Sequence, residues 1–296
     1  MAKNLHLQHP EDSILTGDLS VLDWFTAVGN LSVKIDGAPA VVFGINPATG
    51  NFFVGTKSVF NKVKIKINES HQDIDANHTG NVAEILHACF DYLPRLNAII
   101  QADFIGFGGS DEYKPNTITY KFPEVVTEEI ILAPHTVYIA ENDLRDAVAY
   151  PMNFIITDTP YCKFVKPDAY IQHGQDSFAD VAEVCAFARQ MSTLVNFVSN
   201  KEAAKIEKQL NTCIREGRDI NSKEFDCDYL LIEFWLLIKS IKADCLFLCR
   251  NNGPEAYIGY DRIDSEGYVM TNKFGMFKLV NRECFSRANF NLAKSW

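Results

Sequence analysis

At residues 31–37 the chain reads LSVKIDG. Val33 and Ile35 are β-branched residues that favour a strand, and the Asp-Gly pair that follows them is typical of a turn. Because successive side chains of a strand point to opposite faces, Lys34 projects away from its two apolar neighbours. The sequence therefore predicts a strand that presents one lysine on its polar face.

The segments that follow extend this strand into a sheet. Residues 40–44 and 51–55 are apolar runs, and the turn residues of 46–50 separate them, which predicts a hairpin. Further strands are expected at 98–107, 117–122, 136–140, 255–260, 267–271 and 276–281. Apolar residues recur at helical spacing in 21–28 and 80–97.

The pattern changes near residue 176. Residues 176–250 read as three amphipathic helices, and strand-like sequence returns after them. We therefore expect an α+β protein whose core, 1–175 and 251–296, is interrupted by a helical insertion at 176–250.

The bulk composition limits the classes of protein. A chain of 296 residues with 47% hydrophobic residues can form one large domain or two small ones. The net charge of −10 argues against non-specific coating of nucleic acid. The sequence contains neither an 18-residue apolar window nor an N-terminal signal core, so we expect a cytoplasmic protein (host cytoplasm if it is viral) without a membrane span. We also expect no obligate protein partner, and the eight cysteines, without a C-x-x-C pair, predict buried free thiols.

Common signatures of nucleotide-binding proteins and hydrolases are absent. The chain has no G-x-x-x-x-G-K-[ST] loop, no G-x-G-x-x-G before a helix, no H-E-x-x-H and no G-x-S-x-G. The lysine of residues 34–37, KIDG, is the chemical feature that remains. A lysine near other cations can lose its proton and act as a nucleophile, and Lys57 and Lys278 are the candidate cations. The alternative is an ordinary lysine before a turn.

KIDG at 34–37 resembles motif I of the covalent nucleotidyltransferases, the superfamily of ATP-dependent DNA ligases, RNA ligases and mRNA capping enzymes. The resemblance implies a ligase-type nucleotidyltransferase domain of antiparallel sheets flanked by helices. It also implies that Lys34 attacks the α-phosphate of ATP and forms a lysyl-nucleotide with release of pyrophosphate. In the ligases the nucleotide then passes to a 5′-phosphate, and a 3′-hydroxyl displaces it.

Later segments resemble the other motifs of this superfamily in the right order. Lys57 in GTKS matches the basic segment of motif Ia, and Asp103 matches the acidic residue of motif III. Phe122 fits the aromatic residue that stacks on the purine. Glu266 in EGYV resembles motif IV, and Lys278 in FKLV resembles motif V.

The sequence departs from the superfamily pattern in several places. Lys57 stands where arginine is usual, Asp103 stands where glutamate is usual, and motif V has one lysine instead of two. Tyr120 is a rival for the stacking role, and Glu255 is a second candidate for motif IV. Glu266 and Lys278 are only twelve residues apart (278 − 266), which predicts a tight hairpin between them. The 18 residues after Lys278 (296 − 278) are too few for the OB domain of many ligases.

The resemblance assigns a role to each of these residues. Lys34, Asp36 and Lys278 would be catalytic; Lys34, Gly37, Lys57, Asp103, Phe122, Glu266 and Lys278 would hold ATP; and Asp103 and Glu266 would hold Mg²⁺. The expected function is an ATP-dependent polynucleotide ligase, and RNA ranks above DNA because no OB domain is expected. The alternatives are nucleotidyl transfer to another acceptor, DNA ligation, and a degenerate, non-catalytic module that binds nucleotides or nucleic acid.

A second resemblance concerns Pro39-Ala40, 114–120 and 285–290. These segments resemble an uncharacterised ligase-like group of tailed phages over roughly 5–170 and 250–296. Two polar segments also have ligand-like residues: His9, Glu11 and Asp12, and then His71, Asp73, Asp75 and His78. We interpret the first as a solvated turn and the second as a polar loop. His135, expected just before a strand, is interpreted as structural.

Overall fold

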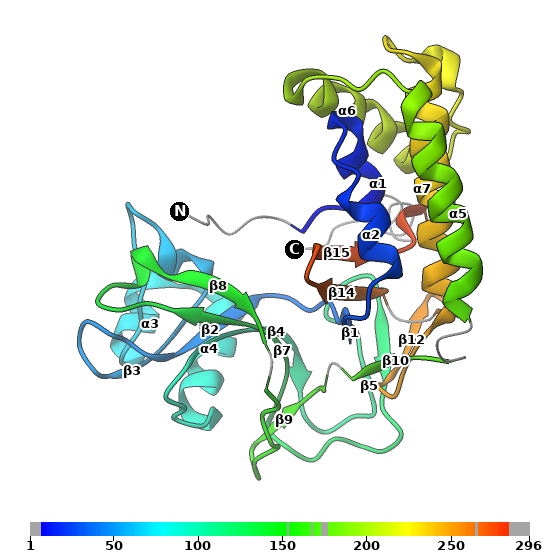
Figure 1. Cartoon of the computed structure of the whole chain (residues 1–296). Coiled ribbons are helices and arrows are strands. Elements are labelled where there is room, and N and C mark those ends of the chain that lie inside the picture. The colour runs from blue at the N-terminus through cyan, green and yellow to red at the C-terminus, as the bar shows by residue number, and fades with distance from the viewer. Residues whose placement is uncertain (1–6, 153, 167, 173–176, 264–265, 284–296) are drawn as a thin grey trace. The chain divides into compact units, whose positions relative to one another are not determined.

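The computed structural model describes residues 7–152, 154–166, 168–172, 177–263 and 266–283 (Figure 1). In these ranges the protein is a mixed α/β structure, and every strand pairing is antiparallel except that of β7 with β9. The chain forms two compact units. Within the described residues, the first unit comprises 35–166 and 253–263, and the second comprises 7–34, 168–252 and 266–283.

A six-stranded sheet organises the first unit. Its strands are β2 (Ala40–Ile45), β3 (Phe52–Gly55), β4 (Ile99–Phe107), β7 (Ile130–Ile139), β8 (Val148–Pro151) and β9 (Cys162–Phe164). The order is β3-β2-β4-β7-β8, and β9 pairs with β7. The predicted hairpin at 40–55 is confirmed, since Val42 lies opposite Gly55.

Both faces of this sheet are covered. Side chains of β2 alternate between the faces, so Val41 and Phe43 join one core cluster while Val42 joins the other. The helices α3 (His71–Asn77) and α4 (Gly80–Tyr92) pack on the face of Val41 and Phe43. The 80–97 helix is thus confirmed, with an earlier end.

A second sheet of the first unit joins strands that are far apart in sequence. It consists of β5 (Glu112–Tyr113), β6 (Thr119–Lys121), β12 (Glu255–Ile258) and β13 (Asp261–Ile263). The order is β13-β12-β6-β5, and Ala256 lies opposite Tyr120. The segment that follows the long helices therefore completes a sheet begun before them.

Helices dominate the second unit. They are α1 (Pro10–Ser13), α2 (Ser20–Thr26), α5 (Ser177–Met191), α6 (Asn200–Glu216) and α7 (Tyr229–Leu248). Ser199 and Glu202 cap the start of α6 reciprocally, and Gly217 ends it in the left-handed conformation. The three helices expected in 176–250 are confirmed.

Two small sheets complete the second unit. One contains β1 (Asn30–Val33), β14 (Tyr268–Asn272) and β15 (Gly275–Leu279), in the order β1-β14-β15; the other pairs β10 (Ala169–Ile171) with β11 (Cys249–Asn251). The fully buried Trp24 of α2 packs edge-on against Phe277, and its Nε1 donates to the carbonyl of Met270 at 3.3 Å. The tight hairpin predicted between Glu266 and Lys278 is confirmed as β14-β15.

Some local predictions were wrong. Residues 71–77 form helix α3 and not a loop, because Ser70 caps the helix and Ile74 is buried. Lys62, Lys64 and Lys66 alternate in the sequence as on one face of a strand, but residues 62–66 do not form one, and Lys64 has a positive φ of 56°. The division into 1–175, 176–250 and 251–296 stays a prediction; in the second unit the 168–252 segment groups with 6–34 and 264–296. None of the described helices has the length and apolar character needed to cross a bilayer.

Candidate functional site

The β1-β14-β15 sheet of the second unit has one apolar and one polar face. Val33, Tyr268 and Leu279 are buried on the apolar side. On the other side Ser32 lies opposite Val269, which in turn lies opposite Lys278. Lys34 is two residues beyond Ser32, so it projects from the same face as Lys278.

The register gives the spacing of the two lysines. The Lys34 amide donates to the Gly267 carbonyl at 2.8 Å, whereas Lys278 lies opposite Val269. The two lysines are therefore two residues apart along the strand direction and two strand spacings apart across the sheet. Strand spacings of about 4.8 Å and a rise of about 3.3 Å per residue put the two Cα atoms roughly 12 Å apart. Flexible four-carbon stems allow both ammonium groups to approach one phosphate from this distance.

Glu266 forms an ion pair with Lys34 across 232 positions of sequence. The two side chains are 22% and 16% exposed, so the pair is shielded but reachable from solvent. A carboxylate at this position stabilises the ammonium form of the lysine. The proton must therefore leave before Lys34 can attack an electrophile.

Gly267, the residue after Glu266, allows the backbone to approach β15 closely. Its φ is +132°, in the region that favours glycine, and a Cβ there would lie 2.3 Å from the Leu279 carbonyl oxygen. The glycine therefore lets the chain turn from Glu266 into β14 directly beside β15.

We expect Gly267→Ala to destabilise the second unit by about 1–3 kcal/mol, the cost of a strained backbone position. Chemical denaturation measures this loss. Gly50→Ala is the matched control for a positive φ, since a Cβ at Gly50 meets nothing within 4 Å. Equal losses in the two variants would contradict a special role for the contact with Leu279.

His9 lies in the electrostatic field of the same lysines. The Lys278 amide donates to the carbonyl of the preceding residue, Gln8, at 3.1 Å. Burial lowers the pKa of His9 to about 2, helped by the charges of Arg282, Lys242, Lys278 and Lys34. Its buried Nδ1 has no hydrogen-bond partner among the described residues. The imidazole is therefore neutral at physiological pH.

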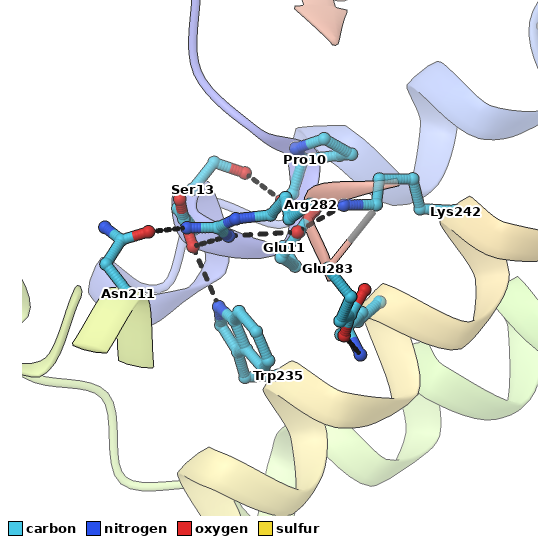
Figure 2. A network of polar contacts seen from close by, with 10 residues as sticks. Pro10, Glu11, Ser13, Asn211, Trp235, Lys242, Arg282 and Glu283 are labelled. Carbon is cyan, nitrogen blue, oxygen red and sulfur yellow. Dashed lines mark hydrogen bonds and ion pairs between the residues drawn. The ribbon is translucent and has the colours of Figure 1, made fainter. Parts of the chain in front are cut away.

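A buried network of charges includes Glu11 and Asp12, which follow His9 in the sequence, and Figure 2 shows Glu11, Lys242 and Arg282 of this network. The Arg282 guanidinium donates to Glu11 at 3.0 Å and to Asp12 at 2.9 Å, and Lys242 of α7 pairs with Glu11. Trp235 Nε1 donates to Asp12 at 3.0 Å. The solvated turn predicted for 9–12 is thus wrong, because Glu11 is 0% exposed.

Asp36 and Gly37 are held within the first unit. The Asp36 amide donates to the Tyr120 hydroxyl at 2.8 Å, and Asn116 donates to the Asp36 carboxylate at 2.7 Å. A Cβ on Gly37 would lie 2.3 Å from the Phe104 carbonyl oxygen. Segment 114–120 therefore fixes the turn at Asp36-Gly37, a role that the sequence did not indicate.

Asp103 lies on β4, opposite Ala40 and Ala133. Its side chain is 15% exposed, and its carboxylate lies 3.7 Å from His135 Nε2. His135 lies inside β7, not before a strand as expected, and also contacts Gln101 at 3.3 Å. A register shift in the β4-β7 pair, which sequence cannot reveal, brings these side chains together.

The remaining predicted residues of the first unit differ in exposure. Phe122 is buried and packs edge-on against Tyr113, so a purine could stack on it only after it is uncovered. The rival Tyr120 is fully buried. Lys57 opens a short 3-10 helix and is exposed. Glu255, the alternative for motif IV, pairs with Arg262 at 3.0 Å.

The structure thus brings Lys34, Glu266 and Lys278 together in the second unit, and it links Asp36 and Gly37 to β4 in the first. Across the described ranges, no group of three or more His, Cys, Asp or Glu side chains could hold a metal ion. Segment 285–290 lies outside the described residues.

Comparison with protein families matches residues 4–230 and 226–294 to a family described as "Family of unknown function (DUF6267)". No curated protein and no solved structure matches the chain.

Proposed function

Since the chain belongs to DUF6267, a family of unknown function, we propose its activity from the Lys34 site: nucleotidyl transfer through a covalent lysyl-AMP, with a polynucleotide, RNA before DNA, as the final acceptor. The proposed fold is accordingly a ligase-type nucleotidyltransferase domain.

One observation carries the proposal. Lys34 and Lys278 project from one face of a three-stranded sheet, and Glu266 contacts Lys34. These residues come from three segments whose order along the chain resembles motifs I, IV and V. A chance K-x-D-G sequence would not require the other two charged residues to lie on the same small sheet.

The chemistry uses these residues as follows. The Lys34 ammonium loses its proton, and Nζ attacks the α-phosphorus of ATP. A P–N bond forms, the bond to the β-phosphate oxygen breaks, and pyrophosphate leaves. Lys278 stabilises the negative charge that develops on the α-phosphate. An oxygen of a 5′-phosphate then attacks the same phosphorus, and the P–N bond breaks to release the Lys34 amine. Finally a 3′-hydroxyl, which loses its proton to solvent, attacks the 5′-phosphate and expels AMP.

Mg²⁺ belongs to this proposal as a charge partner of the triphosphate. It binds through one or two carboxylates together with substrate phosphates and water, so the chain need not supply a three-ligand group. Asp103 of the first unit and Glu266 of the second are the candidate carboxylates, and each is partly exposed. When bound, the ion would neutralise charge on the leaving pyrophosphate.

The proposed acceptor rests on the resemblance and on local charge. Lys57, Lys62 and Lys64 are exposed on one short segment of the first unit, and such a cluster suits a phosphate backbone. The net charge of −10 limits this attraction to a local surface.

The test is covalent labelling. The protein is incubated with α-labelled ATP or GTP and Mg²⁺, and the label is mapped by peptide mass spectrometry. We expect AMP on the peptide that contains Lys34, in a bond that acid cleaves. A label on another residue, or bound ATP with no covalent label, would refute the proposal. Adding 5′-phosphorylated RNA or nicked DNA then identifies the acceptor, and transfer to neither would reject ligation while leaving nucleotidyl transfer intact.

A further inference from the structure

Two histidines face each other on the helices that cover the six-stranded sheet. His71 of α3 and His87 of α4 place their Nδ1 atoms 2.7 Å apart. The ring centroids are 5.0 Å apart and the ring planes are inclined by only 19°. The two side chains are 45% and 30% exposed, so solvent reaches the pair.

Each outer nitrogen of the pair contacts a carboxylate. His71 Nε2 lies 3.0 Å from Asp91, and His87 Nε2 lies 2.9 Å from Asp75. An ionised carboxylate only accepts hydrogen bonds, so both Nε2 atoms must be donors. In a neutral imidazole the other nitrogen then carries a lone pair. Two lone pairs therefore point at each other over 2.7 Å unless a cation lies between them.

We propose that His71 and His87 form a binding site for one divalent transition-metal ion, of the Zn²⁺ class, through their two Nδ1 atoms. Neutral imidazole is a preferred ligand of Zn²⁺, Cu²⁺ and Ni²⁺. A metal-bound histidine usually donates its other ring N–H to a carboxylate, which is the arrangement of Asp75 and Asp91. The ion would lie between the two Nδ1 atoms, where two acceptors otherwise face each other.

The geometry needs only a small change to hold the ion. Zn–N bonds of about 2.05 Å at a tetrahedral angle put two ligand nitrogens about 3.3 Å apart, against 2.7 Å in the structure. Both side chains are partly exposed, so their rings can separate by this amount. The described part of the chain offers no group of three ligands, and the ion therefore keeps positions for water or an incoming ligand.

The surrounding charges favour a divalent ion over a single proton. Asp75 and Asp91 contribute two negative charges at the pair. A cationic side chain, that of Arg95, also interacts with Asp91, and its guanidinium lies over the Phe52 ring. One divalent ion balances both carboxylates, whereas one proton balances half of their charge.

The test is a titration of chelator-treated full-length protein with ZnCl₂, followed by calorimetry in buffers of different ionisation enthalpy. We expect one ion per chain with release of a proton. His71→Ala and His87→Ala should each abolish binding, and Asp75→Asn or Asp91→Asn should weaken it by about 10- to 100-fold. Gln72→Ala and Glu84→Gln, exposed positions on the same two helices, should leave binding unchanged.

Two results would overturn the site. The first is wild-type protein that binds no Zn²⁺, because the pair would then hold a proton only. The second is binding that persists in both histidine variants. Melting curves of the metal-free variants ensure that lost binding is not lost folding: each variant should melt near the wild type. Zn²⁺ should raise the melting temperature of the wild type and of the two control variants, but not that of His71→Ala or His87→Ala.

Discussion

Replacing Arg282 with methionine should lower the free energy of unfolding of the second unit by about 3–5 kcal/mol. Arg282 is 5% exposed and donates to two carboxylates, those of Glu11 and Asp12. Methionine preserves much of the side-chain volume but removes the charge and the donors. Urea denaturation, monitored by tryptophan fluorescence, measures the loss through Trp24 and Trp235, which are both buried in this unit.

The size of the effect follows from burial. With Arg282 absent, Glu11 still pairs with Lys242. The Asp12 carboxylate then keeps only the indole N–H of Trp235 as a side-chain hydrogen-bond donor among the described residues. A buried charge that loses its counter-charge costs several kcal/mol, far more than the net value of an intact pair. The loss is therefore a penalty of the orphaned carboxylate.

The exposed pair of Arg189 and Asp23 provides the matched control. Arg189→Met should cost at most about 1 kcal/mol, because solvent screens that pair. Adding Asp12→Asn to Arg282→Met should recover part of the loss. If the two single arginine variants lose equal stability, the network is not buried in solution.

The loss in Arg282→Met should also depend on pH. Burial already raises the pKa of Asp12, and the Arg282 guanidinium opposes that rise. Without Arg282 the folded-state pKa lies still further above the unfolded value, so the folded protein binds more protons than the unfolded one. Stability then falls as pH rises. We expect a smaller deficit near pH 5 than near pH 8.

Local sequence patterns predicted the regular elements well. The turn at 46–50 between two apolar runs predicted the β2-β3 hairpin, and the short spacing from Glu266 to Lys278 predicted the β14-β15 hairpin. Helical periodicity predicted α4 to α7, with ends that differ by a few residues. Contacts between neighbours in sequence determine these elements, so turn residues and apolar periodicity were enough to predict them.

Long-range pairing could not be predicted in the same way. Strand β12 completes a sheet with β6 across more than a hundred residues, and nothing in either segment specifies its partner. The same limit applies to the buried charges. Glu11 and Asp12 looked like a solvated turn, because their partners Lys242 and Arg282 lie more than 200 residues away.

The same distinction between local patterns and long-range contacts applies to the residues of the candidate site. The order of motifs singled out Lys34, Glu266 and Lys278. Lys278 lies in β15, Lys34 directly follows β1, and Glu266, two residues before β14, forms an ion pair with Lys34. Tyr120 was named only as a rival for the stacking role. The hydrogen bonds by which Asn116 and Tyr120 hold Asp36 were missed because they depend on the fold of a loop. His9 was noticed only as a metal-ligand candidate; its position near the two lysines comes from the pairing of Gln8 with β15.

Changing Lys34 to arginine should abolish covalent labelling while leaving the protein folded. Arginine keeps the positive charge that Glu266 contacts, but a guanidinium cannot be deprotonated in a protein and offers no nucleophile. We expect labelling to fall by a factor of about 10⁴ or more, the scale of losing an essential catalytic group. Single-turnover labelling with α-labelled ATP measures it.

Variants of two further lysines in the β14-β15 hairpin distinguish the role of a nucleophile from the role of a positive charge. Lys278→Met should slow labelling by about 10²- to 10³-fold, since it removes one stabilising charge from the transition state and no reacting atom. Lys273, exposed in the turn between β14 and β15, is the control, and Lys273→Met should label like the wild type. Full labelling of Lys34→Arg would remove Lys34 as the nucleophile. Equal slowing by Lys278→Met and Lys273→Met would instead mean that general surface charge, and not a defined phosphate contact, accounts for the effect of Lys278.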